Sequence, residues 1–360
     1  MNLHDLVNRP TAWLPGAGEG GGIVVSSRIR LARNLKDTAF PGWAGEDECA
    51  HIWRRLVPTL REAPALEKPL QVDMGDCSAL DRHILFERHL ISRELAERKA
   101  GGGLFLRGDE GLSVMVNEED HLRLQALRPD LDLSGAWREV NQLDGELERD
   151  LDFAFSPQLG YLTACPTNVG TGLRASVMLH VPGLVLVKEM TAVVKGMAKI
   201  GLAVRGLWGE GSEASGHLFQ VSNQMTLGEA EAEIIGNLEQ IVTEIVEHEQ
   251  NARWRLFEQN EAYLRDRVGR AIGLLTHAHV LNSKEALDLL SDLRLGIDMN
   301  MVEQWNHQVV NQLLLQTQPG HLQKQQGRRL KPGERDVARA DMVREQLRQS
   351  KEKRSGNSDE

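Results

Sequence analysis

Hydrophobic and polar positions in the first 260 residues alternate between the two-residue period of strands and the wider spacing of helices. The strand pattern is clearest in residues 22–34, GIVVSSRIRLARN, where β-branched residues lead into strict alternation. A period of two puts Arg28 and Arg30 on one face, and Ile29 and Leu31 on the other. The segment is therefore predicted to be a strand that carries two arginines on the same side.

Further strands and helices are predicted before residue 260. Strands are expected at 104–117 (two short strands around Gly108–Gly111), at 159–187 (interrupted by glycine and proline) and at 219–224. Helices are expected at 46–62, 79–99, 121–127, 135–151, 190–200 and 229–261. This mixture predicts an α+β domain in which an antiparallel sheet is flanked by helices.

After about Asn260 the pattern becomes helical throughout. Residues 261–315 contain no strand signal, and Asn282 with Glu285 is a typical start for a helix. A glutamine-rich bridge and a Gly/Pro break then precede a last charged helix from about Glu334. The predicted organisation is an α+β domain over residues 1–255, an all-helical domain over 256–345 and, because apolar residues are lacking, a disordered tail over 346–360.

The composition permits a sizeable core but argues against a general nucleic-acid binder. Of the 360 residues 41% are hydrophobic and 26% are charged, and the net charge is −10 with a pI of about 5.7. An acidic protein repels polyanions overall, so any site for a polyanion must be a local cluster of cations.

The N-terminal segment, the short apolar stretches and the spacing of the cysteines together predict a cytoplasmic protein. The segment MNLHDLVNRPTAWLP carries charges and prolines where a signal peptide needs an apolar run. The longest apolar stretch, residues 177–187, is too short to span a membrane. Cys49, Cys77 and Cys165 have spacings that suit neither a disulfide framework nor a zinc site.

Four segments hold side chains suited to chemistry on phosphates and guanidinium groups. They are SSRIR at 26–30, NEEDHLR at 117–123, CPTNVGTGLRASVM at 165–178 and RGLWGEGSEA at 205–214. Together they supply five arginines, two clusters of carboxylates and one cysteine. This set suits the transfer of a phosphoryl group from ATP to a guanidinium.

The five arginines are candidates for binding a triphosphate, because the planar guanidinium binds phosphate oxygens bidentately and stays charged. They are Arg28, Arg30, Arg123, Arg174 and Arg205. Arg174 follows Gly170-Thr171-Gly172, where glycine lets backbone N–H groups approach an anion. Taken alone, the pair Arg28 and Arg30 is equally consistent with a guarded strand edge, and each single arginine fits a surface ion pair better. Their joint occurrence favours an anion site.

The carboxylates and the cysteine are candidates for binding the guanidinium of a substrate. Glu118, Glu119 and Asp120 form one cluster, and Glu210 lies in the Gly-rich loop of the fourth segment. A guanidinium is a poor nucleophile because its charge is delocalised, so two carboxylates can hold it in line while one takes its proton. A thiolate at Cys165 would add a third anionic contact, although a small buried hydrophobe is the alternative reading.

On these motifs, residues 22–255 resemble the catalytic domain of the phosphagen (guanidino) kinases. The resemblance implies Glu119, Glu210 and Cys165 as catalytic residues, and Mg²⁺ held mainly by nucleotide oxygens and water, with no metal ligand from the protein. It also implies that ATP is bound by Ser26, Ser27, Arg28, Ile29, Arg30, His89, Arg123, Arg174, Ala175, Ser176, Val177, Met178, Arg205, Gly206, Leu207, Trp208, Gly209 and Glu210.

The order of the domains is similar to that of the bacterial protein-arginine kinases, because the arginine-bearing strand begins some two dozen residues into the chain and the helical domain follows. That resemblance implies phosphorylation of arginine in proteins, delivery of the products to a Clp ATPase and protease for quality control, and a zinc-binding activator protein. The apolar helical stripes after residue 260 predict a homodimer through the helical domain. Neither membrane nor nucleic-acid binding is expected. Trp208 and His217 stand where tyrosine and asparagine are expected.

The resemblance further implies allosteric control by phosphoarginine. The motif RDVARA, which comprises Arg335, Asp336, Val337, Ala338, Arg339 and Ala340, would bind it. Arg335 suits the phosphate and Asp336 suits the guanidinium. A charged surface helix is the alternative for this hexapeptide.

Two other functions remain open from the sequence. One is a kinase of a small guanidino metabolite, and the other is a non-catalytic adaptor that binds phosphoarginine. The absence of a helical domain before the arginine-bearing strand argues against the first, and retention of Glu119, Glu210, Cys165 and the arginines argues against the second.

Overall fold

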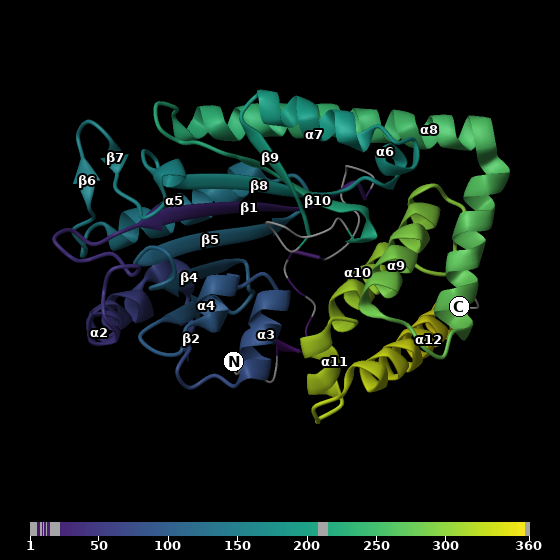
Figure 1. The fold of residues 1–360 in the computed structure, drawn as a ribbon, viewed down its shortest axis with the longest axis horizontal. Coiled ribbons are helices and arrows are strands. Elements are labelled where there is room, and N and C mark those ends of the chain that lie inside the picture. Colours follow the sequence, from purple (N-terminus) through teal and green to yellow (C-terminus); the bar gives the residue numbers. More distant parts are fainter. Residues whose placement is uncertain are drawn as a thin grey trace.

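The computed structural model describes residues 6, 7, 9, 11, 13, 14, 22–207 and 215–356. Its main feature is an eight-stranded antiparallel sheet in the order β2-β3-β4-β5-β1-β8-β10-β9 (Figure 1). The strands are β1 (Val24–Arg33), β2 (Leu70–Asp73), β3 (Gly103–Leu106), β4 (Leu112–Val116), β5 (Leu122–Pro129), β8 (Leu173–His180), β9 (Leu202–Gly206) and β10 (Leu218–Asn223), and a separate hairpin is formed by β6 (Phe155–Ser156) and β7 (Gly160–Tyr161). The α+β class is confirmed.

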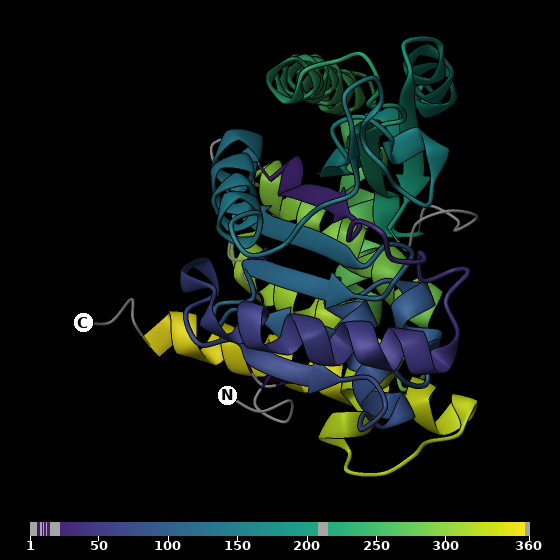
Figure 2. The ribbon, with the colours of Figure 1, turned by 90° about the vertical axis from the view of Figure 1, so that its left-hand side faces the viewer.

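Helices cover both faces of the sheet and form the C-terminal part of the molecule. They are α2 (Glu46–Glu62), α3 (Ala79–Glu87), α4 (Arg93–Glu97), α5 (Leu133–Leu147), α6 (Pro182–Leu186), α7 (Met190–Lys199), α8 (Glu231–His277), α9 (Ser283–Asp298), α10 (His307–Gln316), α11 (Pro319–Gln325) and α12 (Pro332–Gly356). Helices α9–α12 lie at one end of the sheet in Figure 1 and behind it in Figure 2, which looks from the opposite end.

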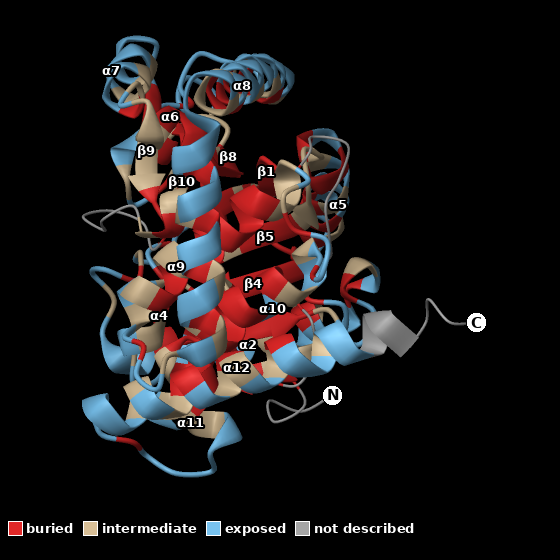
Figure 3. Ribbon diagram, turned by 90° about the vertical axis from the view of Figure 1, so that its right-hand side faces the viewer, coloured by how far each residue is buried: buried red, intermediate tan, exposed pale blue. Residues whose placement is uncertain are grey.

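Strand β1 lies in the middle of the sheet, between β5 and β8. Its side chains alternate as the sequence predicts: Ile29 and Leu31 are fully buried in the main core, which α2, α5 and α8 cover. The opposite face carries Arg28 and Arg30, beside a second core that includes residues of α3 and α4. Figure 3 shows β1, β4 and β5 as buried strands, while the outer face of α12 is exposed.

Two predicted helices are wrong in the described chain. Residues 121–127 form most of β5, because Leu122, Leu124 and Ala126 alternate into the core. The helix predicted over 79–99 is broken into α3 and α4. The break contains His89, whose φ of 58° is left-handed and ends α3.

Helix α8 joins the two parts of the protein. It is longer than predicted, and it bends at Asn260, where φ is −155°. Figure 1 shows it running along the sheet, bending and continuing beside α9–α12. The proposed domain boundary at 255 stays a prediction.

The C-terminal helices have their own core and clear local signals. Asn282 caps α9 by accepting a hydrogen bond from the N–H of Glu285, as predicted. The glutamine-rich bridge contains helix α11. Helix α12 continues to Gly356, through most of the segment predicted to be a disordered tail. Pairs such as Arg348–Glu345 support its polar last turns.

Candidate active site

Four strands bring the five predicted arginines to one face of the sheet. Arg30 on β1 lies directly opposite Arg174 on β8, and Arg28 lies opposite Ser176. Arg123 projects from β5, opposite Ala32 of β1. Arg205 on β9 lies opposite Gln220 of β10, so the same row of side chains extends to β9 at the edge of the sheet. Residues directly opposite in antiparallel strands share a face, so period-two alternation assembles the cluster.

Burial and mutual repulsion make this cluster a candidate anion site. Burial and the charges of Arg123 and Arg174 lower the pKa of Arg28 to about 10. Burial and the neighbouring arginines lower the pKa of Arg30 well below its usual value. The Nε atom of Arg30 is buried and has no hydrogen-bond partner among the described residues. Such a concentration of under-compensated cations fits a polyphosphate ligand.

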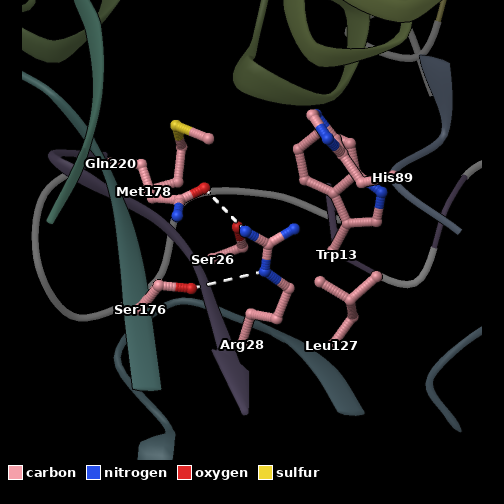
Figure 4. Close-up of a pocket in the computed structure, with 8 residues that line it drawn as sticks. All are labelled: Trp13, Ser26, Arg28, His89, Leu127, Ser176, Met178 and Gln220. Atoms are coloured by element: carbon pink, nitrogen blue, oxygen red, sulfur yellow. Dashed lines mark hydrogen bonds between the residues drawn. The ribbon is translucent and has the colours of Figure 1, made fainter. Parts of the chain in front are cut away.

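Arg28 lies in a small pocket at one end of the cluster (Figure 4). Its Nη2 donates a hydrogen bond of 2.7 Å to Oε1 of Gln220, and its Nε donates one of 3.3 Å to Oγ of Ser176. Figure 4 also shows Trp13 and His89 facing this pocket. The sequence predicts Arg28, Ser176 and His89 here, whereas Trp13 and Gln220 carry no motif that could have revealed them.

His89 is held in place by its neighbours. The left-handed turn after α3 directs it to the pocket, and its carbonyl accepts a hydrogen bond of 2.9 Å from Nε2 of Gln125. Its ring packs edge-on against Trp13, with ring centroids 4.8 Å apart. Burial and the charge of Arg28 lower the pKa of His89 to about 3, so its imidazole is neutral at physiological pH.

Several residues of the predicted ATP site have side chains that serve the fold. Ile29, Ala175 and Val177 point into the main core, on the face opposite the arginines. Ser27 accepts a hydrogen bond from the N–H of Asp132 and donates one to the carbonyl of Asp130. The remaining side chains contribute differently: Ser26 and Met178 line the Arg28 pocket, Leu207 belongs to the second core, and Gly206 ends β9.

The carboxylates of the second segment meet the arginines. Glu118 and Glu119 accept hydrogen bonds of 2.7 and 3.1 Å from Arg123. Glu118 is buried, while the side chain of Glu119 is 41% exposed and is therefore accessible to a substrate. Burial, together with the charges of Asp120 and Glu118, raises the pKa of Glu119 despite its ion pair with Arg123.

Cys165 also lies near the arginine cluster, close to Arg174. It precedes a short 3₁₀ turn, Pro166–Asn168, and its Sγ is 3.0 Å from Oγ1 of Thr167. It is partly exposed, whereas Cys49 and Cys77 are buried. Cys165 and Glu119 lie close enough to Arg174 for their charges to act on the pKa of its guanidinium. The arrangement offers anionic groups to a guanidinium beside cations for phosphate.

The fourth segment is described only at its ends. Trp208, Gly209 and Glu210 lie outside the described residues, so the role of Glu210 stays a prediction. The chain is described again from Ser215. There Nδ1 of His217 lies 2.8 Å from Oγ of Ser291 on α9, and burial lowers the pKa of His217 to about 4.

The RDVARA motif lies on α12 and is divided between the core and the surface. Arg339 is buried and donates hydrogen bonds to the carbonyls of Thr317 and Leu281 and to Asp336. Arg335 and Ala338 are partly exposed, Val337 is exposed and Ala340 belongs to the helical core. Asp336, predicted to meet the guanidinium of a ligand, already pairs with Arg339.

No group of three or more His, Cys, Asp and Glu side chains in the described part of the chain is placed to hold a metal ion. No helix in the same residues is long and apolar enough to cross a membrane.

Solved structures with related folds are phosphagen kinases. The duplicated taurocyamine kinase from Schistosoma mansoni, determined with bound transition state analog components, superposes with a TM-score of 0.59 at 24% identity, over 74% of this chain and 42% of that one. Lombricine kinase gives a TM-score of 0.57 at 21% identity, over 68% of this chain and 70% of that one. At these identities the likeness establishes the fold.

Sequence comparison establishes the family. Residues 57–252 match the ATP:guanido phosphotransferase C-terminal catalytic domain, and residues 261–358 match the protein-arginine kinase McsB C-terminal domain. Protein-arginine kinases from Moorella thermoacetica, Halothermothrix orenii and Bacillus subtilis are 49%, 45% and 42% identical to this chain. Each alignment covers 96% of this chain, and it covers 99%, 99% and 95% of those proteins, respectively. The chain therefore belongs to the protein-arginine kinase family.

Proposed function

We propose that this protein transfers the γ-phosphoryl group of ATP to the guanidinium of arginine side chains in other proteins. The observation that carries the proposal is the meeting of five arginines from β1, β5, β8 and β9 with Glu119 and Cys165. The cations suit the triphosphate, and the anionic groups at the edge of the cluster suit the guanidinium.

In the proposed reaction, a guanidinium nitrogen forms a bond to the γ-phosphorus while the bond between that phosphorus and the bridging β,γ-oxygen breaks. ADP leaves with the electron pair, and one guanidinium proton passes to a carboxylate. Glu119, whose pKa is raised, is suited to accept it, and Glu210 would help to align the guanidinium. The arginines stabilise the charge that spreads over the transferring oxygens.

The buried, unpartnered Nε of Arg30 fits an anionic nucleotide at this face. Mg²⁺ would enter with ATP, because phosphate oxygens and water are ligands that it prefers. When bound, it would neutralise charge on the β- and γ-phosphates. The residues of this chain hold the phosphates, orient the guanidinium and accept its proton.

A protein substrate is favoured over a small guanidino metabolite. The relatives named protein-arginine kinase align with this chain from the catalytic strands through the helical end. The RDVARA helix supports control by phosphoarginine, since Arg335 is accessible on α12. The proposal includes a role in protein quality control through a Clp ATPase and protease, with a zinc-binding activator.

The proposal also includes a cytoplasmic homodimer. Cys49, Cys77 and Cys165 are free thiols, as a reducing compartment favours. The helical part exposes large apolar side chains suited to a contact between two copies: Tyr263, Leu274, Val280 and Val337. Light scattering of the full chain, over a range of concentrations, would test the dimer.

The deciding experiment offers the purified protein Mg-ATP with either a casein-like protein or free arginine, and measures acid-labile phosphate. Labelling of the protein alone is the expected result. Preference for free arginine would instead support a metabolite kinase. Binding of phosphoarginine without any transfer would support the non-catalytic adaptor.

A further inference from the structure

Asn34 follows β1 directly, and its side chain is almost fully buried. Its Nδ2 donates a hydrogen bond of 2.6 Å to Oδ1 of Asp120 and one of 3.0 Å to the carbonyl of Leu162. Its Oδ1 accepts a hydrogen bond of 2.9 Å from the N–H of His121. Both donor hydrogens and the acceptor oxygen of this amide therefore have partners, and these partners come from two distant segments of the chain.

Asp120 connects Asn34 to the residues around the thiol. It is fully buried and directly follows Glu119 in the chain. Its Oδ1 accepts the bond from Asn34 and another of 2.7 Å from the N–H of Ala164, the residue before Cys165. Its Oδ2 is buried without a hydrogen-bond partner among the described residues, so the two donors on Oδ1 are what hold this carboxylate in place.

The turn that carries Glu119 is attached to the chain after β1 a second time, through the ring of His121. Nδ1 of this ring accepts a hydrogen bond of 3.0 Å from the N–H of Leu35. Nε2 must then carry the ring proton, and it lies 3.0 Å from the carbonyl of Ala39. This pattern needs a neutral imidazole, and burial lowers the pKa of His121 accordingly. The two residues after Glu119 are thus both bound to residues 34–39.

The turn that carries Cys165 is held by a further side chain, that of Thr163. Thr163 is buried, and its Oγ1 donates a hydrogen bond of 2.7 Å to the carbonyl of Cys165. The next residue, Ala164, donates its N–H to Asp120. Successive residues before the thiol are therefore fixed, one within the turn and one to the segment of Glu119.

We propose that Asn34 and Thr163 are positioning residues for the transfer to arginine. Through Asp120, Asn34 holds the turns of Glu119 and Cys165 at one separation, and Thr163 fixes the backbone that carries the thiol. Both side chains are buried and would act only through these neighbours. The inference rests on the proposed function, in which the two anionic groups align the guanidinium. Alignment matters because a displacement of about 1 Å can slow a transfer about 100-fold.

The binding of ATP should depend little on these two residues. Arg28, on the same strand as Asn34, is held by Gln220 and Ser176 of the neighbouring strands. Neither of these contacts involves Asn34, Asp120 or the turn before Cys165. Loss of the hydrogen bonds around Asn34 should therefore slow the transfer and leave the affinity for the nucleotide unchanged.

The test compares kcat on a casein-like protein, at saturating Mg-ATP, with the affinity and stoichiometry of ATP binding from calorimetry. Asn34→Ala should lower kcat about 10- to 100-fold, while the Kd for ATP stays within about twofold. An unchanged stoichiometry shows that all molecules are folded. Thr163→Val, which removes one hydroxyl and preserves the shape of the side chain, should lower kcat in the same selective way by a smaller factor.

Matched controls lie on and directly after α10, in the helical part. Asn311 is as buried as Asn34 and accepts a hydrogen bond from Arg294, and Thr317 donates to the carbonyl of Leu313 at 2.7 Å. Below their melting temperatures, Asn311→Ala and Thr317→Val should keep kcat within about twofold of the wild type.

Two results would overturn the positioning role. One is an unchanged kcat in Asn34→Ala, or in Thr163→Val if Asn34→Ala does not fold. The other is an equal loss of kcat in the controls, which would reduce the effect to general destabilisation. A wild-type protein that binds ATP but phosphorylates no protein arginine would instead contradict the proposed function itself.

Discussion

Two arginines three residues apart on β1 lie in opposite electrostatic surroundings. Arg33 is buried and donates three hydrogen bonds to Asp144, so its charge is matched inside the fold. Arg30 is surrounded by Arg28, Arg123 and Arg174, and the charge of Glu118 offsets this only in part. The first contact stabilises the protein, whereas the second arrangement is costly until an anion binds.

Replacing these arginines should therefore have opposite effects. Arg30→Met should leave the free energy of unfolding unchanged or higher, because a repelled cation is removed, while ATP affinity falls at least about tenfold. Arg33→Met should cost about 3–5 kcal/mol, because it leaves Asp144 buried without a counter-charge. Thermal melts with and without ATP measure both effects. A destabilised Arg30→Met that still binds ATP would contradict this account.

Glu119 gives a prediction about pH. Since burial and neighbouring carboxylates raise its pKa, it becomes an ionised base only at a pH above the ordinary glutamate value of 4.5. Activity should be lost as pH falls through the raised pKa, and Glu119→Gln should remove this acidic limb while lowering kcat by about 10²–10⁴. A pH profile of kcat measures this. An acidic limb that persists in the variant would assign it to another group.

The residues of this site differ in how far the sequence could reveal them. Arg28, Arg30 and Arg174 are predictable, because strict alternation fixes the face of each side chain in a strand. Trp13 and Gln220 are not, because their roles come from contacts with distant segments. No local pattern records such contacts.

At the scale of elements, β5 shows why a strand can look like a helix in the sequence. Its segment HLRLQAL has enough leucine to suit a helix, and only pairing with β1 and β4 selects the strand. For a related reason, the sequence does not predict the break between α3 and α4 at His89. A histidine in the left-handed region is tolerated there because Gln125 and Trp13 hold it.

The contact between α3 and α11 leaves no room for a side chain at Gly320. A Cβ atom there would lie 2.7 Å from a carboxylate oxygen of Glu87. Gly320→Ala should therefore displace α11 and lower the melting temperature. Gly145→Ala is the control, because Gly145 lies in α5 with open space around it and should gain about 0.5–1 kcal/mol. Equal melting temperatures for the two variants would refute this contact.

At the scale of the whole molecule, the order of an α+β part and a helical part could be predicted from periodicity, but their packing could not. The hydrogen bonds from Gly320 to Glu87 and from Arg294 to the carbonyl of Gly22 join residues 233 and 272 positions apart. Periodicity within a window of 15 residues carries no information about such pairs.

Control by phosphoarginine can be tested at Arg335 rather than at Asp336. Asp336 supports Arg339, which ties α12 to Leu281 and Thr317, so Asp336→Ala would disturb the fold as well as any ligand. Arg335→Ala is the cleaner variant and should abolish stimulation of the initial rate by added phosphoarginine. Arg328→Ala, at an exposed arginine paired with Glu334, should respond like the wild type. A normal response in Arg335→Ala would return RDVARA to a charged surface helix.

The bond between Glu87 and the start of α11 has a consequence for synthesis on the ribosome. The arginine face is complete once β10 ends at Asn223, but the partner of Glu87 emerges about a hundred residues later. A nascent chain that ends before α11 should therefore hold the end of α3 and the turn at His89 less firmly than the full chain does. Stalled chains that end before and after residue 330 should differ in protection of this turn from proteolysis, so the last helices would complete the packing of the sheet domain only late in synthesis.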